Sequence, residues 1–239
     1  MDTKIDFKNP EFYENRELSW IKFDNRVLSE ARDKSIPLLE RLKFVSITSS
    51  NLDEFFMVRV ASLLDMVHAN YKKRDIAGMT ATEQLAAINK ETRELVDTQY
   101  STYTRSLVPL LNKEGIYLVD EHETLTDEQA AFVDRYFMES VYPVLTPMAV
   151  DASRPFPLIR NKTLNIAALL SSKQNSKETV FATVQVPGVL PRLVPIPSEE
   201  GTTTFILLEQ IIERNIGLLF SNYKVLCAYP YRIMRNADL

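Results

Sequence analysis

The chain has 239 residues, of which 45% are hydrophobic and 25% charged, and its formal net charge at pH 7 is -4. This balance is typical of a globular protein with one large domain or two ordinary ones, and it gives no overall positive field to recruit nucleic acid or an anionic membrane. One cysteine and two histidines offer no disulfide framework and no metal-binding spacing, and no apolar run reaches the roughly 18 residues of a spanning helix. We therefore expect a cytoplasmic protein without a transmembrane segment, and peripheral membrane association is left open.

Apolar residues recur at helical intervals in the first part of the chain, which predicts an amphipathic helix over residues 16–31. Asn15 is the expected N-cap of this helix. Its predicted apolar stripe, in which the aromatic side chains are expected to lie in the core rather than to stack on a base, comprises Leu18, Trp20, Phe23, Val27 and Ala31.

A second helix is expected to begin at Pro37, a position where the missing N–H of proline does no harm. The small polar run at residues 48–51 is expected to interrupt it, so that a third helix begins at or near Asn51. Asp53 and Glu54 would then occupy the first turn of that helix, where carboxylates stabilise the helix dipole. Arg59, which follows among apolar residues, is expected to pair with an acidic residue of another helix.

The last helix of this region is predicted to be long. Thr80 and Glu83 have the spacing of a capping box, and apolar residues continue at helical spacing for about thirty residues, roughly 45 Å of helix. No glycine interrupts the stretch between Gly78 and Gly115. Residues 1–112 are therefore predicted to form an all-helical N-terminal domain.

In residues 113–239 the spacing of apolar residues is no longer mainly helical, and this region is predicted to form a second, α+β domain. A second capping box at Thr126 and Gln129 predicts a helix running to about Tyr142, and another helix is expected within residues 208–220. Short β-branched and aromatic runs predict strands, mostly joined by short links, which favours a largely antiparallel sheet. The expected strands lie at residues 116–119, 163–170, 179–186, 192–196, 203–208 and 223–229.

Five stretches of the chain resemble the N-terminal and head domains of bacterial polyphosphate kinases. They are NRELSWIKFDNRVLSEA, PLLERLKFVSITSSNLDEFFMVRVA, LTPMAVDASRPFPLIRNKTLNIA, VPGVLPRLVPIP and YRIMRNADL. The resemblance implies an enzyme that reversibly transfers the terminal phosphate of ATP to inorganic polyphosphate, through a phosphohistidine and with Mg²⁺, and that forms a homodimer. The family's phosphohistidine, phosphate-binding arginines and metal site belong to C-terminal domains that nothing here resembles. The head domain is thus expected to be incomplete at its C-terminal end.

The residues themselves show no catalytic or metal site. Phosphoryl transfer needs a nucleophile or base beside several cations. His68 is expected at the cationic tail of a helix and His122 in an acidic surface loop, and no glycine-rich phosphate-binding motif occurs. We therefore expect this chain to be inactive by itself.

Asn51 admits two interpretations. From the residues alone it is an N-cap, whose side-chain oxygen accepts a backbone N–H. Its carboxamide could also match the donor and acceptor on one edge of adenine. In the resembling family the asparagine of the matching SSNLDEF motif contacts ATP, so the resemblance implies that Asn51 is an ATP-binding residue.

One local basic cluster, formed by Arg154, Arg160 and Lys162, precedes a predicted strand. A solvated loop is the ordinary interpretation of this cluster, and a path for anionic polyphosphate is the functional one.

The sequence leaves two hypotheses for the whole chain. It is either the non-catalytic part of a polyphosphate kinase, supplying ATP contact, polyphosphate path and dimer surface, or a purely structural dimerisation module without a ligand.

Overall fold

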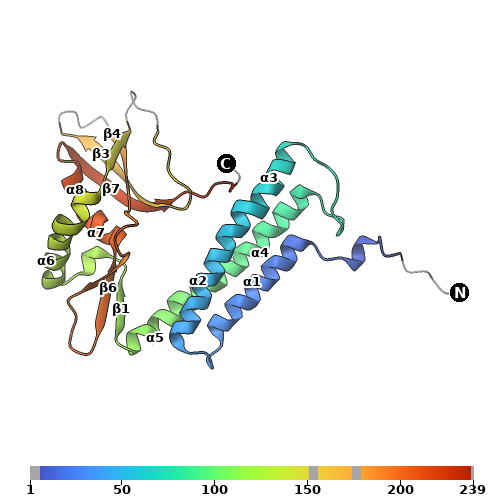
Figure 1. Cartoon of the computed structure of the whole chain (residues 1–239), viewed down its shortest axis with the longest axis horizontal. Helices are drawn as coiled ribbons and strands as arrows, with labels where there is room; N and C mark the ends of the chain where they lie inside the picture. The colour runs from blue at the N-terminus through green and yellow to red at the C-terminus, as the bar shows by residue number, and fades with distance from the viewer. Residues whose placement is uncertain (1–5, 151–155, 174–178, 238–239) are drawn as a thin grey trace. The chain divides into compact units, whose positions relative to one another are not determined.

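A computed structural model describes residues 6–150, 156–173 and 179–237 (Figure 1). The chain divides into two compact units. The first, which we call the helical unit, consists of residues up to Leu111 together with the segment from Arg235, and the second, the sheet unit, is Asn112–Met234.

Two long continuous helical rods and α1 make up most of the helical unit. The short helix η1 (Pro10–Phe12) precedes α1 (Arg16–Arg32). One rod joins α2 (Leu38–Phe55), the π-helical turn η2 (Phe56–Val60) and α3 (Ala61–His68), and the other joins α4 (Ala81–Thr102), the π-helical turn η3 (Tyr103–Leu107) and α5 (Val108–Lys113). The long helix predicted after Thr80 is therefore confirmed. The predicted interruption at residues 48–51 is wrong, because α2 passes through this run without a break.

The predicted helix caps are present. The Asn15 side chain accepts from the backbone N–H groups of Glu17 and Leu18 at the start of α1. Thr80 and Glu83 form a complete capping box at the start of α4. Each satisfies backbone donors that have no partner within the helix, which fixes where these helices begin.

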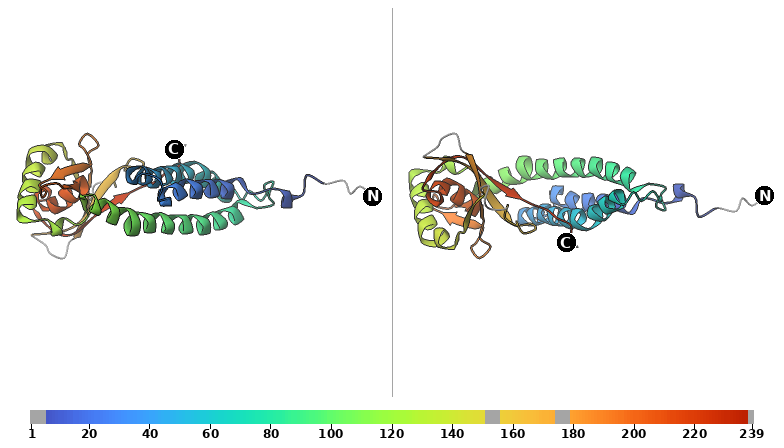
Figure 2. Two further views of the ribbon diagram at one scale, coloured as in Figure 1. Left: turned by 90° about the horizontal axis from the view of Figure 1, so that it is seen from below. Right: turned by 90° about the horizontal axis from the view of Figure 1, so that it is seen from above.

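The core of the helical unit lies between α1, the α2–α3 rod and α4 (Figure 2). Phe23, predicted to lie in this core, is 46% exposed, so that prediction is wrong. Trp20 is partly buried and stacks on Phe55, with ring centroids 4.4 Å apart. The buried face of α1 is shifted from the predicted apolar stripe and includes polar residues: it consists of Glu17, Ile21, Asp24, Leu28 and Ala31.

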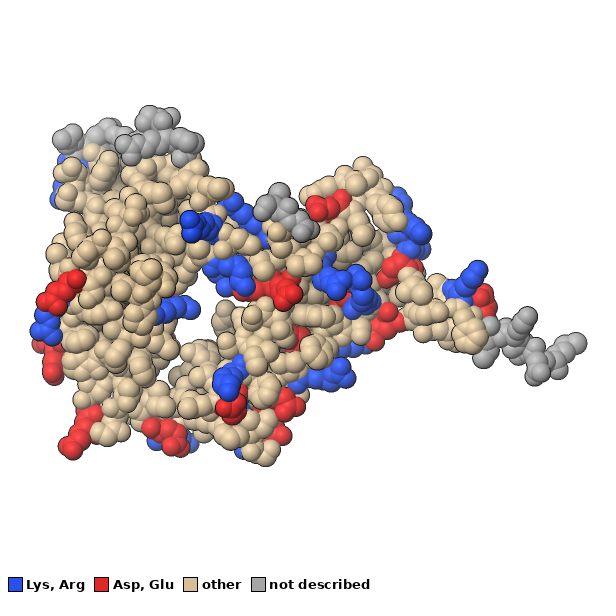
Figure 3. All heavy atoms as spheres, in the orientation of Figure 1, with Lys and Arg blue, Asp and Glu red and all other residues tan. Residues whose placement is uncertain are grey.

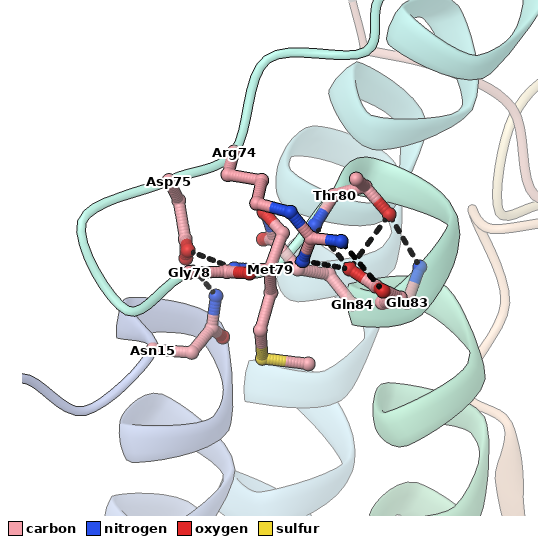
Figure 4. Close-up of polar contacts among 8 residues, drawn as sticks. All are labelled: Asn15, Arg74, Asp75, Gly78, Met79, Thr80, Glu83 and Gln84. Atoms are coloured by element: carbon pink, nitrogen blue, oxygen red, sulfur yellow. Dashed lines mark hydrogen bonds and ion pairs between the residues drawn. The ribbon is translucent and has the colours of Figure 1, made fainter. Parts of the chain in front are cut away.

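The loop before α4 is tied to the start of α1 (Figure 4). Asp75 accepts from Asn15 Nδ2 at 2.7 Å and from the backbone N–H of Met79 at 2.7 Å. Asn15 thus caps α1 with its oxygen and holds the loop with its nitrogen. Arg74 donates to the carbonyl of Gly78 and pairs with Glu83, which continues the network into the capping box.

We expect Asp75→Ala to lower the free energy of unfolding of the helical unit by about 2 kcal/mol, because buried Asn15 loses a charged hydrogen-bond partner. Urea denaturation followed by the fluorescence of Trp20, the single tryptophan of the chain, measures this change. Asp75→Asn retains one acceptor oxygen and should lose about half as much. Equal stability of Asp75→Ala and wild type would contradict this account of the loop.

The sheet unit contains two sheets. The first has the order β1-β6-β5, with β1 parallel to β6, and the second has the order β2-β4-β3-β7 and is antiparallel throughout. The prediction of a largely antiparallel α+β fold is therefore confirmed. The strands are β1 (Ile116–Val119), β2 (Pro147–Val150), β3 (Leu164–Ser172), β4 (Thr179–Gln185), β5 (Leu193–Ile196), β6 (Thr203–Leu207) and β7 (Tyr223–Arg232).

Helices of the sheet unit close its core. Thr126 and Gln129 form the predicted capping box at the start of the first of them. Fully buried Phe137 and the inward side chains of β3, β4 and β6 belong to one apolar cluster. The helices are η4 (His122–Thr124), α6 (Asp127–Tyr136), the π-helical turn η5 (Phe137–Val141), η6 (Tyr142–Val144), α7 (Leu208–Arg214) and α8 (Ile216–Leu219).

Within the described ranges, no helix is both long enough and apolar enough to cross a bilayer.

Candidate functional site

Asn51 lies in the last third of α2, whose N-cap is Pro37. The predicted N-cap role is therefore wrong, because Asn51 is preceded by helix and its own N–H and C=O belong to the helix interior. The small polar residues 48–50 that precede Asn51 are accommodated within α2. Thr48 is buried and bonds back to the carbonyl of Phe44 at 3.0 Å, so its hydroxyl is satisfied within the helix.

The Asn51 carboxamide faces α1, where its Nδ2 donates to Asp24 Oδ1 at 2.8 Å. Asp24 has no exposed surface, whereas Asn51 is half-buried. The pair therefore spans from the interior of the helical unit toward its surface. Asp24 lies on the buried face of α1 because it is three residues after Ile21 and four before Leu28.

The neighbouring turn of the same helix pair fixes the geometry of this contact. α1 and α2 are antiparallel neighbours, so Trp20, four residues before Asp24, meets Phe55, four residues after Asn51. Their rings are stacked with an interplanar angle of 7°. The aromatic stack thus holds the two helices in the register that brings Asp24 to Asn51.

Burial changes the chemistry of Asp24. It raises the pKa of this carboxyl from 3.8 to about 6, and the hydrogen bond from Asn51 limits the rise. Its second oxygen, Oδ2, is the one buried side-chain polar atom without a hydrogen-bond partner in the described part of the chain. A carboxylate in this state is costly for the fold, because its ionised form has lost water on one oxygen without gaining a protein donor.

The contact with Asp24 uses one of the two N–H groups of Asn51. The second N–H and the acceptor oxygen Oδ1 make no other side-chain contact among the described residues. A donor and an acceptor side by side are what an adenine edge requires. Substitution of Asn51 by aspartate would place two carboxylates together, so it cannot be the neutral change that a cap position would allow.

The neighbours of Asn51 differ from expectation. Asp53 and Glu54 lie in the last turn of α2 rather than in a first turn, so their predicted interaction with a helix N-terminus is wrong. Arg59 is exposed and forms no ion pair with the residues that the structure describes, contrary to the predicted pairing with another helix. Arg59 lies in η2, whose buried residue is Val60.

Two residues of the basic cluster lie on a turn before β3. Arg160 and Lys162 are exposed, and Arg154 lies outside the described residues. The carbonyl of Arg160 accepts from the hydroxyl of Thr163 at 2.9 Å, and the N–H of Lys162 donates to the carbonyl of Ile233 at 2.9 Å. The turn is thus anchored to the segment after β7 and presents both cations at the surface.

Charges elsewhere are mixed. On the face drawn in Figure 3, Lys and Arg side chains alternate with Asp and Glu over the helices of the helical unit. A cavity of about 530 Å³ in the sheet unit is lined by hydroxyls and by Glu128 and Glu199, with no Lys or Arg among its lining residues. Neither surface suits a polyanion as well as the turn at Arg160.

The two histidines are held in different ways. His68 is exposed at the end of α3, as predicted. His122 is not the surface residue predicted: its side chain is only 17% exposed and its Nδ1 lies 3.1 Å from Gln210 Oε1. No group of three or more His, Cys, Asp or Glu side chains suited to a metal ion occurs in the described ranges.

Comparisons with known proteins cover nearly the whole chain. The model of the polyphosphate kinase N-terminal domain matches residues 13–119, and that of the polyphosphate kinase middle domain matches residues 128–239. Polyphosphate kinase from Lactiplantibacillus plantarum is 51% identical over 98% of this chain and 32% of its own length, and that from Halalkalibacterium halodurans is 49% identical over 98% and 33%.

The fold agrees as well. The crystal structure of polyphosphate kinase from Porphyromonas gingivalis matches with a TM-score of 0.82 and 30% identity, over 95% of this chain and 33% of that one. The chain therefore spans about a third of the length of its curated relatives. With both domain models matched in order, this chain belongs to the polyphosphate kinase family and contains its N-terminal and middle domains.

Proposed function

We propose that this chain is the non-catalytic N-terminal part of a cytoplasmic enzyme that reversibly transfers the terminal phosphate of ATP to inorganic polyphosphate through a phosphohistidine. The proteins named polyphosphate kinase that it resembles support the reaction. Mg²⁺ is assigned to the complete enzyme only, since the described residues gather no metal-ligand group. This part would supply contact with ATP, a path for polyphosphate and a dimer surface.

The contact with ATP is assigned to Asn51. The observation that carries it is the carboxamide of Asn51, which is half-buried in the last third of α2 and keeps an acceptor oxygen and one N–H beyond its contact with Asp24. A position inside a helix requires neither group, and a capping role, which would use the oxygen, does not apply within α2. Adenine presents a donor at N6 and an acceptor at N7 that together match them.

The test is an equilibrium titration of the chain with ATP. We expect Asn51→Ala to weaken ATP binding about tenfold or more, given about 1 to 3 kcal/mol for a bidentate contact with adenine. Asn89→Ala is the matched control, because Asn89 is an exposed asparagine of α4 whose side chain hydrogen-bonds to Arg93 alone among the described residues. Trp20 fluorescence checks that each variant is folded. Equal ATP affinity of wild type and Asn51→Ala would contradict the assignment.

The polyphosphate path is assigned to the anchored turn that carries Arg160 and Lys162. An anionic polymer is held by exposed cations on a fixed backbone, and its binding weakens as salt rises. The double variant Arg160→Ala/Lys162→Ala should bind polyphosphate more weakly and with a smaller salt dependence. Lys224→Ala, which removes an exposed lysine from β7, should leave both unchanged.

Self-association is proposed through the helical unit, by way of the α2–α3 rod rather than α4. The apolar residues of α4, such as Ile88 and Leu95, are used inside the bundle. The α2–α3 rod instead exposes large apolar side chains to solvent, namely Leu39, Ile47, Val58, Leu64 and Met66. Light scattering at micromolar concentration should report a dimer of the wild type and a monomer of Ile47→Glu. A dimer that binds no ATP would favour the purely structural module.

The chain by itself is expected to transfer no phosphate, because His68 is exposed at the end of α3 and His122 is held against Gln210. Incubation with radiolabelled ATP should leave no acid-labile phosphate on the protein and no polymer. Labelling of His68 or His122 would contradict this expectation.

A further inference from the structure

The ionisation of Asp24 decides which way the Asn51 carboxamide points. A carboxylate can accept hydrogen bonds but cannot donate one, so only the nitrogen of Asn51 can face Asp24 Oδ1 at 2.8 Å. The carboxamide oxygen must then lie on the opposite side of the group. An asparagine free in solvent can present either atom to a ligand, whereas this one is held in a single orientation.

We propose that Asp24 is a positioning residue that fixes the Asn51 carboxamide with its acceptor oxygen toward the bound base, and thereby sets the preference for adenine over guanine. This inference rests on the proposed contact between Asn51 and ATP. Asp24 itself has no exposed surface and touches no ligand.

Packing alone does not explain an aspartate at this position. Leucine has the same number of side-chain heavy atoms, and Asp24 is surrounded along α1 by buried Ile21 and Leu28. An apolar side chain would therefore fill the space without the desolvation of an oxygen that has no partner. The one hydrogen bond that Asp24 makes with another side chain among the described residues is the bond that orients Asn51.

The orientation matters because the two purine bases differ at one atom of the relevant edge. Adenine carries a donor at N6 beside the acceptor N7, whereas guanine carries the acceptors O6 and N7. A carboxamide oxygen that is held toward the base accepts from N6 of adenine and is repelled by O6 of guanine. A carboxamide that can turn over would offer its N–H to O6 and so admit guanine.

Three variants separate orientation from packing. Asp24→Leu keeps the side-chain shape and removes the acceptor, and Asp24→Ala removes it without any risk of added bulk. Asp24→Asn keeps the size and an acceptor oxygen but adds N–H groups that can donate to the Asn51 oxygen, so it should hold the carboxamide in one orientation less firmly than the carboxylate does. Trp20 fluorescence reports whether each variant is folded.

The first measurement needs no nucleotide. In the nuclear magnetic resonance spectrum of the ¹⁵N-labelled chain, the two side-chain N–H signals of Asn51 should be widely separated and exchange slowly in the wild type, because one of them is bonded to a buried carboxylate. In Asp24→Leu and Asp24→Ala they should move toward the positions of solvent-exposed asparagines, and in Asp24→Asn their separation should be intermediate. Unchanged Asn51 signals in both apolar variants would overturn the positioning role, whatever the protein does with ATP.

The second measurement is the ratio of ATP to GTP affinity. Asp24→Leu and Asp24→Ala should narrow this ratio about tenfold, mainly by improving the binding of GTP, and Asp24→Asn should narrow it by a smaller factor. If ATP binding depends on Asn51 but Asp24→Leu and Asp24→Ala leave the ratio of ATP to GTP affinity unchanged, the positioning role of Asp24 is overturned and the proposed function is not. ATP binding that does not depend on Asn51 would overturn the proposed function, and this inference with it.

Discussion

Replacing Phe55 with alanine is expected to lower the free energy of unfolding of the helical unit by about 3 to 5 kcal/mol. Phe55 is 2% exposed, stacks on Trp20 and meets the edge of Phe56 at 5.9 Å between ring centroids. Its removal would leave a cavity between α1 and α2 that the long rods cannot easily collapse. The same change should loosen the register that brings Asp24 to Asn51.

Urea denaturation followed by Trp20 fluorescence measures the loss. Phe23→Ala is the matched control, because Phe23 is also an aromatic residue at this helix pair but is 46% exposed. We expect that variant to lose about 1 kcal/mol or less. Similar losses for the two phenylalanines would contradict the position of the core described here.

The stability of the helical unit is expected to fall by about 2 kcal/mol between pH 4 and pH 6 because of Asp24 alone. Its pKa is 3.8 in the unfolded chain and about 6 in the folded one, so over this interval the folded state holds a proton that the unfolded state has released. Raising the pH therefore favours unfolding until Asp24 is ionised in both states. The loss is nearly complete above about pH 7.

Other carboxyls act in the opposite direction. Hydrogen bonds from Ser35 and Thr80 hold the pKa values of Asp33 and Glu83 below their usual range, and these groups add stability as the pH rises. The contribution of Asp24 is therefore the difference between wild type and Asp24→Asn, measured by urea denaturation from pH 4 to pH 7. A difference that does not change across this range would show that the Asp24 carboxyl is not desolvated.

Local signals allowed much of the fold to be predicted. The N-cap at Asn15 and the capping boxes at Thr80 and Thr126 depend on residues within one helical turn, so they can be predicted from the local sequence. Most strands were found because β-branched and aromatic runs alternate with polar turns. β2 was missed, since its four residues begin with a proline and carry no alternating pattern.

Long-range contacts could not be predicted in this way. The interruption expected at residues 48–51 was wrong because no proline or glycine occurs there and burial of Leu52 and Phe55 outweighs the weak helix propensity of serine and asparagine. The partner of Asn51 was missed because a search for apolar periodicity ignores charged residues. One signal was available: Asp24 falls at the helical interval between Ile21 and Leu28, which places it on the buried face.

The most direct measurement of the central claim is the response of the Asn51 side-chain N–H signals as ATP is added to the ¹⁵N-labelled wild-type chain. If Asn51 reads adenine, these signals should shift in a saturable way with ATP and shift much less with GTP at the same concentration, while the side-chain signals of Asn89 stay in place. Asn51 signals that remain unmoved while ATP saturates the protein would show that the base is bound elsewhere and would contradict the account.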